Sequence, residues 1–431
     1  MKKIIFFIVT FVFSVCLSCA VAKESDKRIS FKFDFGSGRI EPGYIRILPT
    51  TVYTKELGYG FEPKAEVLAV DRFGDDTLRG DFCTSDKPFY FSVALPEGNY
   101  KVIVTLGASE GESIATIKAE LRRLMVEKAQ TSAGKFETRT FIVNTRTPRI
   151  PTGGEVRLKG REKTFEAWAW DDKLTLEFNG MRPCVCTVEV SRVDDIPTVY
   201  ILGDSTVCDQ ALEPWNSWGQ MLPRFFKPAI AIANHAESGE SLRSSLGARR
   251  LDKVMSLMKP GDYLFIQFGH NDMKSRSPNA LAIYKSDLKR FVDEAHGRGG
   301  IPVLMTSMHR KSLDDEGKVK NTLGDYPRTV RQVAKEENVT LIDLHNMSAS
   351  LYEAWGPENI DKAFVDGTHH NSYGSYQLAK CVVEGIRQSK LDLAKYIVDD
   401  FTGFDPNYPD DIDSFNIPAS PMSDPKKPEG S

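Results

Sequence analysis

The sequence predicts two domains of different class: a β-sandwich over residues 23–195 and a three-layer α/β/α domain with a parallel sheet over residues 196–396. Three observations support this prediction. The chain has 431 residues, enough for about two or three domains. Before residue 197, short runs alternate apolar and polar residues, as half-buried strands do. After it, uniformly apolar runs alternate with segments of helical spacing, which is typical of a parallel sheet covered by helices.

The composition fits a globular protein with a slightly acidic surface. Apolar residues make up 41% of the chain and charged residues 27%, and the formal net charge is −3. A nucleic-acid-binding protein would show a basic excess and basic patches. We therefore expect no nucleic-acid partner.

Residues 1–22 have the pattern of a secretory signal peptide. Two lysines precede an apolar run that ends at Leu17, and Ala20-Val21-Ala22 supplies a cleavage site of small residues. The run is too short to span a bilayer comfortably, and no other stretch approaches ~18 apolar residues, so we expect no transmembrane segment. Leu17-Ser18-Cys19 is close to a bacterial lipobox, which makes a lipid anchor at Cys19 the alternative to simple cleavage. Either way we expect a bacterial protein that is exported, in the periplasm, at the cell surface or outside the cell.

Five cysteines follow the predicted signal peptide, and their odd number leaves at least one without a partner in the chain. Cys184 and Cys186 stand two residues apart on a predicted strand and point to the same face, which disfavours a bond between them. A bridge from one of them to Cys83 and small buried thiols are both compatible with the sequence. The spacing matches no zinc motif, so we expect no metal.

In the first domain, paired runs predict β-hairpins. Residues 89–95 and 100–106 are split by Pro96-Glu97-Gly98-Asn99, a set of turn formers. Residues 165–170 and 174–178 repeat the pattern around a turn. Many short strands with polar turns indicate a two-sheet sandwich.

In the second domain, apolar runs predict the parallel strands at 199–202, 230–233, 263–268, 302–305 and 340–343. Helical spacing predicts helices between them, among them 281–296 and 326–337. Reactive residues of such sheets gather where strands end and helices begin. Residues 397–431 are rich in Pro and Asp with little periodicity, which indicates a peripheral strap or a disordered tail.

The first of these apolar runs leads into Gly203-Asp204-Ser205-Thr206. We expect Ser205 at the carboxyl end of a buried strand and at a helix N-terminus, where backbone N–H groups favour negative charge. Alone, this signal is weak, because an Asx-type turn with a capping serine has the same residues.

Three further blocks follow other strands or loops: residues 234–241 with Gly239, Gly269-His270-Asn271-Asp272, and Asp366-Gly367-Thr368-His369 ahead of a helix that starts near Tyr373. Together with the serine they supply what acyl transfer needs: a nucleophile, oxyanion donors, and a base held by a carboxylate. The spacing from Asp366 to His369 lets the carboxylate fold back onto Nδ1 of the imidazole and leaves Nε2 free for Ser205.

In these four blocks the sequence resembles the SGNH (GDSL-type) hydrolases, and more narrowly the rhamnogalacturonan acetylesterases of carbohydrate esterase family 12. The blocks stand in the family's order. The resemblance implies a flavodoxin-like SGNH fold for the second domain. Residues 118–125 are similar to the accessory β-domain of bacterial members, which implies a galactose-binding-like sandwich for the first domain.

Carried over position by position, the resemblance implies a catalytic triad and an oxyanion hole. Ser205 attacks the ester carbonyl, His369 acts as general base and then as general acid, and Asp366 holds the tautomer of the histidine. The N–H groups of Ser205 and Gly239 and the side-chain amide of Asn271 form the oxyanion hole. The resemblance implies no cofactor and no metal.

Three residues near the blocks are weaker candidates for substrate contacts. Glu237 stands where the family often has a small or apolar residue, so it is a candidate to line the mouth of the site; a solvated loop carboxylate is the alternative. Trp215 is a candidate to stack on a sugar ring, with helix packing as the alternative. His270 is a candidate substrate contact, with a structural hydrogen-bonding role as the alternative.

Two ambiguities concern neighbouring residues. His370 follows His369, but only His369 has the family's spacing from Asp366. Trp168 and Trp170 share a face of the predicted strand and are candidates for a sugar platform, and a sandwich core is the simpler explanation.

The sequence therefore predicts a secreted serine esterase that removes O-acetyl groups from plant cell-wall polysaccharide, specifically acetylated pectin with rhamnogalacturonan as the leading substrate. Two alternatives stay open. One is a pectin methylesterase or an acetylesterase on another glycan such as xylan. The other is a non-catalytic carbohydrate-binding protein on the same scaffold.

Overall fold

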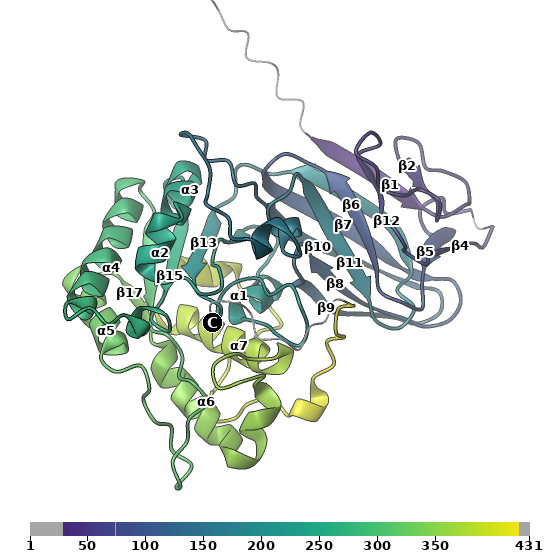
Figure 1. The fold of residues 1–431 in the computed structure, drawn as a ribbon. Coiled ribbons are helices and arrows are strands. Elements are labelled where there is room, and N and C mark those ends of the chain that lie inside the picture. Colours follow the sequence, from purple (N-terminus) through teal and green to yellow (C-terminus); the bar gives the residue numbers. More distant parts are fainter. Residues whose placement is uncertain (1–28, 74, 422–431) are drawn as a thin grey trace, which may run out of the picture.

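The computed structural model describes residues 29–73 and 75–421. The predicted signal peptide and Cys19 lie outside the described residues. Figure 1 shows an all-β part beside a mixed α/β part, and the predicted fold class is confirmed. Within the described ranges, none of the helices combines the length and the apolar character that crossing a membrane would take.

The β part is a sandwich of two mostly antiparallel sheets. The larger sheet has the order β10-β7-β12-β1-β2, with β5 pairing with β12 and β4 pairing with β5, and the smaller has the order β3-β6-β11-β8-β9. Phenylalanine side chains fill the space between them, and the rings of Phe33 and Phe91 are 5.1 Å apart. The strands are β1 (Ser30–Phe35), β2 (Ile45–Ile47), β3 (Tyr59–Phe61), β4 (Leu68–Asp71), β5 (Asp81–Thr84), β6 (Phe89–Ala94), β7 (Gly98–Ala108), β8 (Ser113–Ala119), β9 (Arg123–Thr131), β10 (Lys135–Thr145), β11 (Lys173–Asn179) and β12 (Val185–Arg192).

The first predicted hairpin is wrong, although both of its strands exist. β6 pairs with β3 and β11 in the smaller sheet, whereas β7 pairs with β10 and β12 in the larger one. The turn at Pro96 therefore carries the chain from one sheet to the other, and the Tyr100 hydroxyl donates to the Pro96 carbonyl at 2.7 Å. Turn residues mark a reversal of the chain, but they do not say which sheet takes each strand.

The second predicted hairpin is also wrong, because residues 165–170 are not a strand. This stretch holds the short 3-10 helix η2 (Ala167–Ala169). Trp170 is buried with the Arg146 guanidinium 4.6 Å from its ring centre, and Trp168 contacts Tyr90 with ring centres 5.0 Å apart. The two indoles therefore share no strand face, and the sugar platform considered for them is absent.

The α/β part has a parallel sheet with the order β14-β13-β15-β16-β17. Each predicted apolar run forms one strand: β13 (Thr198–Gly203), β14 (Ala231–Asn234), β15 (Tyr263–Gln267), β16 (Ile301–Met305) and β17 (Thr340–Ile342). The helices are α1 (Trp218–Met221), α2 (Leu242–Gly247), α3 (Arg250–Leu257), α4 (Ala280–Gly297), α5 (Tyr326–Glu336), α6 (Leu344–Asn359) and α7 (Ser372–Gln388).

Alternate residues of each parallel strand face opposite helical layers. Ile201 packs into a core that includes residues of α1, α6 and α7. Its neighbour Leu202 packs into a second core with residues of α2, α3, α4 and α5. Burial on both faces explains why these strands read as continuous apolar runs in the sequence.

The two parts meet at the turn between β8 and β9, inside the segment similar to the accessory domain. Arg122 in this turn donates through Nη1 to the carbonyls of Gln210 and Trp215, each at 2.9 Å, and pairs with Glu213. Gln220 of α1 donates in return to the Leu121 carbonyl at 2.6 Å. The β part is therefore docked directly on the chain that follows Ser205.

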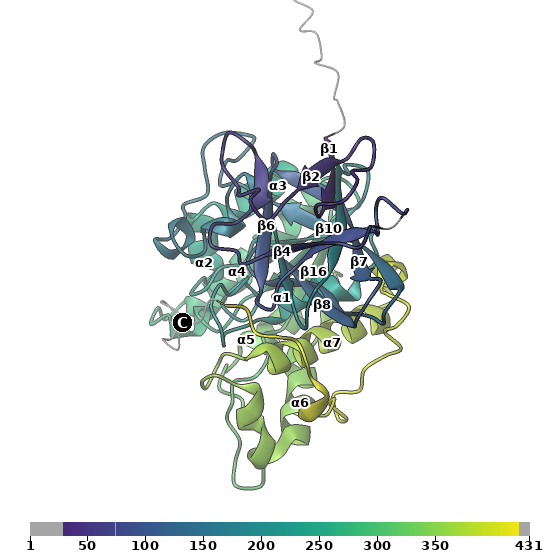
Figure 2. The same ribbon diagram turned by 90° about the vertical axis from the view of Figure 1, so that its right-hand side faces the viewer.

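Residues 397–421 form the predicted strap. Lys380 of α7 pairs with Asp410 at 2.6 Å, and Lys118 of β8 donates to the Pro418 carbonyl at 2.7 Å. Figure 2 shows this segment passing α6 and α7 on its way to the sandwich. Residues 422–431 lie outside the described residues, and the domain boundaries at 195 and 396 stay a prediction.

Within the described ranges, the five cysteines are buried free thiols, at positions 83, 184, 186, 208 and 381. The bridge considered for Cys83 is absent for a geometric reason. Cys83 lies directly opposite Val185 across the β5–β12 pair, so their side chains share a face of the sheet. Cys184 and Cys186 flank Val185 and point to the other face.

Candidate active site

Ser205 lies at the carboxyl edge of the parallel sheet, two residues after the end of β13 at Gly203. A side chain at Gly203 would place its Cβ 2.8 Å from the Gln267 carbonyl of the next strand, so only glycine fits there. The chain then turns sharply, because the Asp204 carboxylate accepts the backbone N–H of Thr206 at 2.9 Å.

The turn at Ser205 does not continue as a helix. Residues 205–207 are a turn, and the next helix, α1, begins at Trp218. The predicted helix N-terminus at Ser205 is therefore wrong. The side-chain amide of Gln210 donates to the Ser205 carbonyl at 2.7 Å and occupies an acceptor that the first turn of a helix would use.

The side chains of Ser205, His369 and Asp366 come together in one chain of hydrogen bonds. Nε2 of His369 is 2.8 Å from Oγ of Ser205. Nδ1 of the same ring is 2.9 Å from Oδ2 of Asp366. Oδ1 of Asp366 also accepts the backbone N–H groups of Thr368 at 2.6 Å and His369 at 2.7 Å. The carboxylate thus closes the loop and orients the ring that faces the serine.

The electrostatics of this group suit proton transfer. Burial acts to raise the pKa of Asp366, but the hydrogen bonds and charge of His369 and the N–H of Thr368 outweigh it and hold that pKa well below its ordinary value. Asp366 is therefore ionised near neutral pH and stabilises a proton on Nδ1 of His369. Nε2 is then the acceptor that faces the Ser205 hydroxyl, as general-base catalysis requires.

His370 points into the protein interior. Its Nε2 is 2.8 Å from the Tyr352 hydroxyl, and its ring centre is 4.0 Å from that of Phe364. Burial lowers the pKa of His370 well below its usual value. The histidine that contacts Ser205 is therefore His369 and not His370.

Gly239 and Asn271, the predicted oxyanion donors, follow β14 and β15. Gly239 has a φ of 74°, a left-handed conformation that suits glycine. The Asn271 side chain is fixed at both ends: Nδ2 donates to the Glu240 carbonyl at 3.0 Å, and Oδ1 accepts from Lys274 at 2.9 Å. Sequence reasoning missed Lys274, although its place three residues after Asn271 was a usable signal.

Trp215 and His270 are both buried, in different surroundings. The Trp215 indole stands edge-on to the His369 ring, with centres 5.6 Å apart. His270 uses both ring nitrogens internally: Nε2 is 3.1 Å from the Met308 carbonyl and Nδ1 is 3.4 Å from the Asp204 carboxylate. These contacts match the structural alternative for His270.

Glu237 is neither a solvated loop carboxylate nor a residue of an open mouth. Its side chain is buried, and Oε1 is 2.7 Å from Nε of Arg161, which comes from the β part. Burial, together with the charge of Glu162, raises the pKa of Glu237 to about 7. This placement corrects the sequence-based interpretation, and no local pattern around Glu237 announces a partner 76 positions earlier in the chain.

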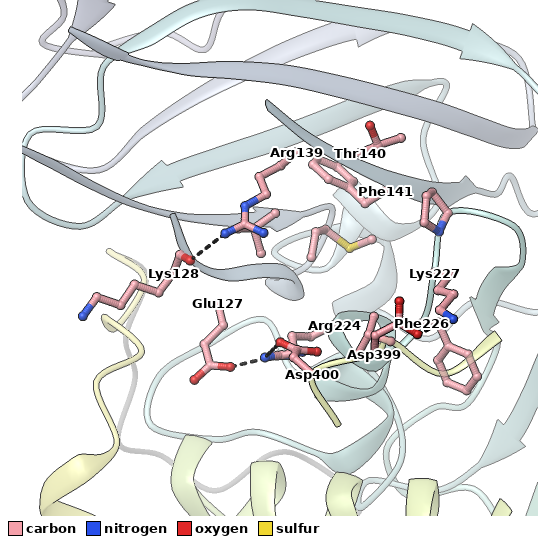
Figure 3. Close-up of a pocket in the computed structure, with 14 residues that line it drawn as sticks. Glu127, Lys128, Arg139, Thr140, Phe141, Arg224, Phe226, Lys227, Asp399 and Asp400 are labelled. Atoms are coloured by element: carbon pink, nitrogen blue, oxygen red, sulfur yellow. Dashed lines mark hydrogen bonds and ion pairs between the residues drawn. The ribbon is translucent and has the colours of Figure 1, made fainter. Parts of the chain in front are cut away.

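Two hollows lie near the features described above, one between the β part and the strap and the other beside Asn271. A groove of about 660 Å³ runs between β9, β10 and the strap, where Arg224 binds Glu127 and Asp400 at 2.8 Å each (Figure 3). None of the predicted catalytic residues is among the described residues that line it. A hollow of about 450 Å³ borders Asn271 and Asp272, beside the proposed oxyanion donors.

Two family models match the chain, one in each part. The GDSL-like Lipase/Acylhydrolase family model matches residues 201–375, a range that contains all four sequence blocks. The Beta-agarase/YXIM esterase-like, galactose-binding domain-like model matches residues 31–138.

Curated relatives carry esterase names. Rhamnogalacturonan acetylesterase RhgT of Bacillus subtilis (strain 168) is 36% identical over 217 residues, covering 46% of this chain and 94% of RhgT. The uncharacterized esterase YxiM of the same organism is 28% identical over 382 residues, covering 84% of this chain and 91% of YxiM. The crystal structure of YxiM shares 26% identity at a TM-score of 0.46, covering 84% of this chain and 99% of that chain.

Proposed function

This chain belongs to the GDSL-like lipase/acylhydrolase family and is a carboxylic ester hydrolase, and we propose that it removes O-acetyl groups from rhamnogalacturonan. The observation that supports the chemistry is the continuous contact from Ser205 through His369 to Asp366, with distances of 2.8 and 2.9 Å. The observation that supports the substrate is the likeness to RhgT over nearly the whole of that relative.

In the first half of the proposed reaction, His369 takes the hydroxyl proton of Ser205 as Oγ attacks the acetyl carbonyl. The carbonyl oxygen becomes an oxyanion, and the proposed donors to it are the N–H groups of Ser205 and Gly239 and the Asn271 amide. His369 then gives its proton to the sugar oxygen as the ester bond breaks. The products are the free sugar hydroxyl and an acetyl group on Ser205.

In the second half, water replaces the sugar. His369 takes a proton from the water, whose oxygen attacks the acetyl carbonyl and forms a second oxyanion in the same hole. The bond to Ser205 then breaks, and His369 returns the proton to Oγ. Acetic acid leaves and ionises to acetate near neutral pH, and the enzyme is restored.

We also propose that the enzyme acts outside the cytoplasm and that the β part is an accessory domain. A polysaccharide substrate is met outside the cell membrane, and residues 1–22 have the pattern of a signal peptide. The match of residues 31–138 to a galactose-binding domain-like model supports the assignment of the β part.

The substrate is tested by measuring acetate and methanol released from native rhamnogalacturonan, acetylated xylan and methylated homogalacturonan. We expect acetate to be released fastest from rhamnogalacturonan, with no methanol. Faster acetate release from xylan would overturn the choice of glycan but keep the chemistry. Methanol as the main product would overturn the choice of ester, and no release from any of the three would contradict the proposed function.

A further inference from the structure

The loop of residues 237–240, which contains the proposed oxyanion donor Gly239, is held by a cation from the β part. Lys159 lies in the segment that links β10 to β11, outside the α/β part. Its Nζ donates to the Ser238 carbonyl at 2.6 Å and pairs with the Glu240 carboxylate at 2.8 Å. One lysine therefore holds the residues on both sides of Gly239.

A second cation from the same segment reaches the same carbonyl. Arg161, in the short 3-10 helix η1 (Arg161–Lys163), donates through Nη2 to the Ser238 carbonyl. Its Nε donates to Glu237 at 2.7 Å, and the side chain is only 6% exposed. The charge of Arg161 is thus placed in the interior, where its effect on a neighbouring dipole is weakly screened.

The Ser238 carbonyl and the Gly239 N–H belong to one peptide group. Charge-assisted hydrogen bonds to the carbonyl oxygen draw electron density toward it and make the N–H on the other side of the group a stronger donor. They also fix the plane of the peptide. A fixed peptide plane matters at Gly239, which has a φ of 74°, because glycine is the residue type with the most backbone freedom.

The same segment reaches the other proposed donor through Glu240. The Glu240 carbonyl accepts Nδ2 of Asn271 at 3.0 Å. The Glu240 carboxylate is held by Lys159 at 2.8 Å and by Arg250 at 3.7 Å. Both proposed donors that lie outside the Ser205 turn are therefore connected to Lys159.

From these contacts we propose that Lys159 and Arg161 are positioning residues of the oxyanion hole, which orient and polarise the Gly239 N–H through the Ser238 carbonyl. The proposal rests on the proposed esterase function and deepens it. It gives the β part a role in the chemical step, because the two cations that complete the site come from that part of the chain.

The test compares Lys159→Met with Lys163→Met in the full-length protein. Lys163 is exposed in the same 3-10 helix as Arg161 and lies outside the contacts described above. Losing a whole oxyanion donor costs about 10²–10³ in kcat, so we expect a weakened donor to cost Lys159→Met about 10-fold in kcat. KM should stay within about 2-fold, because the oxyanion forms only in the transition state. Lys163→Met should match the wild type in both constants.

A second readout separates positioning from general stability. Methylboronic acid adds to a serine hydroxyl as a tetrahedral anion, so its inhibition constant reports on the oxyanion hole. We expect Lys159→Met to weaken this inhibition by the same factor as kcat. Lys159→Arg keeps the donor and should recover most of both losses. Arg161→Lys, which keeps the charge of a buried residue, should lie between the wild type and Lys159→Met.

The possible results divide clearly. If the wild type releases acetate and Lys159→Met has wild-type kcat and wild-type boronate affinity, the positioning role is wrong and the proposed function stands. A higher KM with an unchanged kcat would also overturn the positioning role. So would a loss of kcat that Lys159→Arg does not recover. If the wild type releases no acetate from any glycan, the proposed function itself is wrong. Should Arg161→Lys not fold, the Lys159 series decides alone.

Discussion

The indole of Trp215 stands edge-on to the imidazole of His369, with ring centres 5.6 Å apart and planes at 81°. The backbone of Trp215 is fixed as well, because its carbonyl accepts from Arg122 at 2.9 Å. A residue of the β part thus supports the tryptophan that borders the proposed base. The His369 ring, which exchanges protons with Ser205 in the proposed reaction, contacts Asp366 on one side and the Trp215 indole on another.

Replacing Trp215 should disturb that ring. Edge-to-face aromatic pairs contribute about 0.5–1.5 kcal/mol beyond their buried area. We expect Trp215→Ala to lower kcat by about 3- to 10-fold, while Trp215→Phe, which keeps an aromatic edge, should lose less. Acetate-release kinetics measure the effect. Equal kcat values for Ala and wild type would show that the indole does not position His369.

Arg122 should be a strong determinant of stability. It is buried, binds two carbonyls and pairs with Glu213. Removing one partner of a buried ion pair costs about 3–5 kcal/mol, so Arg122→Met should lower the free energy of unfolding by that amount in urea titrations. Arg139→Met removes a surface pair with Glu137 and should cost less than about 1 kcal/mol. Similar losses for the two variants would argue against Arg122 as the anchor between the parts.

Asp366→Asn should leave the fold intact and remove most of the activity. An asparagine keeps the shape of the side chain but no longer stabilises a proton on Nδ1 of His369, and the comparable change in a serine protease triad costs about 10⁴ in kcat. Asp361→Asn, an exposed carboxylate paired with Lys311, is the matched control and should keep full activity. Wild-type kcat in Asp366→Asn would remove Asp366 from the triad.

Asp272 should make the stability of the protein depend on pH. Burial raises the pKa of Asp272 from 3.8 to about 7; the N–H of Leu242 opposes this, and the charge of Asp204 adds to it. The folded state therefore binds this proton more tightly than the unfolded state. The free energy of unfolding should fall as the pH rises from about 4 to about 7, by up to about 4 kcal/mol from this group.

The neutral variant Asp272→Asn isolates that contribution. Its amide oxygen can still accept the Leu242 N–H, which Oδ1 of Asp272 accepts at 2.9 Å, but it carries no titrating proton. In urea titrations the stability of the variant relative to the wild type should increase between pH 4.5 and pH 7.5. A difference that stays constant over this interval would mean that Asp272 does not titrate there.

The parallel sheet was predictable because it depends on strong local signals, and the contact of Ser205 with His369 was predicted from the four sequence blocks together and their resemblance to the SGNH hydrolases. Strands buried on two faces leave uniform apolar runs, and the carboxyl ends of parallel strands meet at one edge. The spacing of Asp366 and His369 also fixes a local turn. Pattern and spacing were sufficient for the sheet and for this turn, whereas the signal of Gly203-Asp204-Ser205 was weak without the other blocks.

The partner of Glu237 and the secondary structure of residues 165–170 were not predictable in this way. The burial of Glu237 depends on Arg161, a residue of the other domain. Trp170 reads as a strand residue, but it lies under the guanidinium of Arg146. Ion pairs and cation–π contacts between distant segments leave no periodic trace in the sequence.

The rate of acetate release by Ser205→Ala, measured beside the wild type on the same acetylated rhamnogalacturonan, decides whether Ser205 is the nucleophile. The substitution removes only the hydroxyl group, whose Oγ lies 2.8 Å from Nε2 of His369. We expect kcat to fall by at least about 10³, with an unchanged midpoint of unfolding in urea. A folded Ser205→Ala protein that releases acetate at the wild-type rate would show that Ser205 is not the nucleophile.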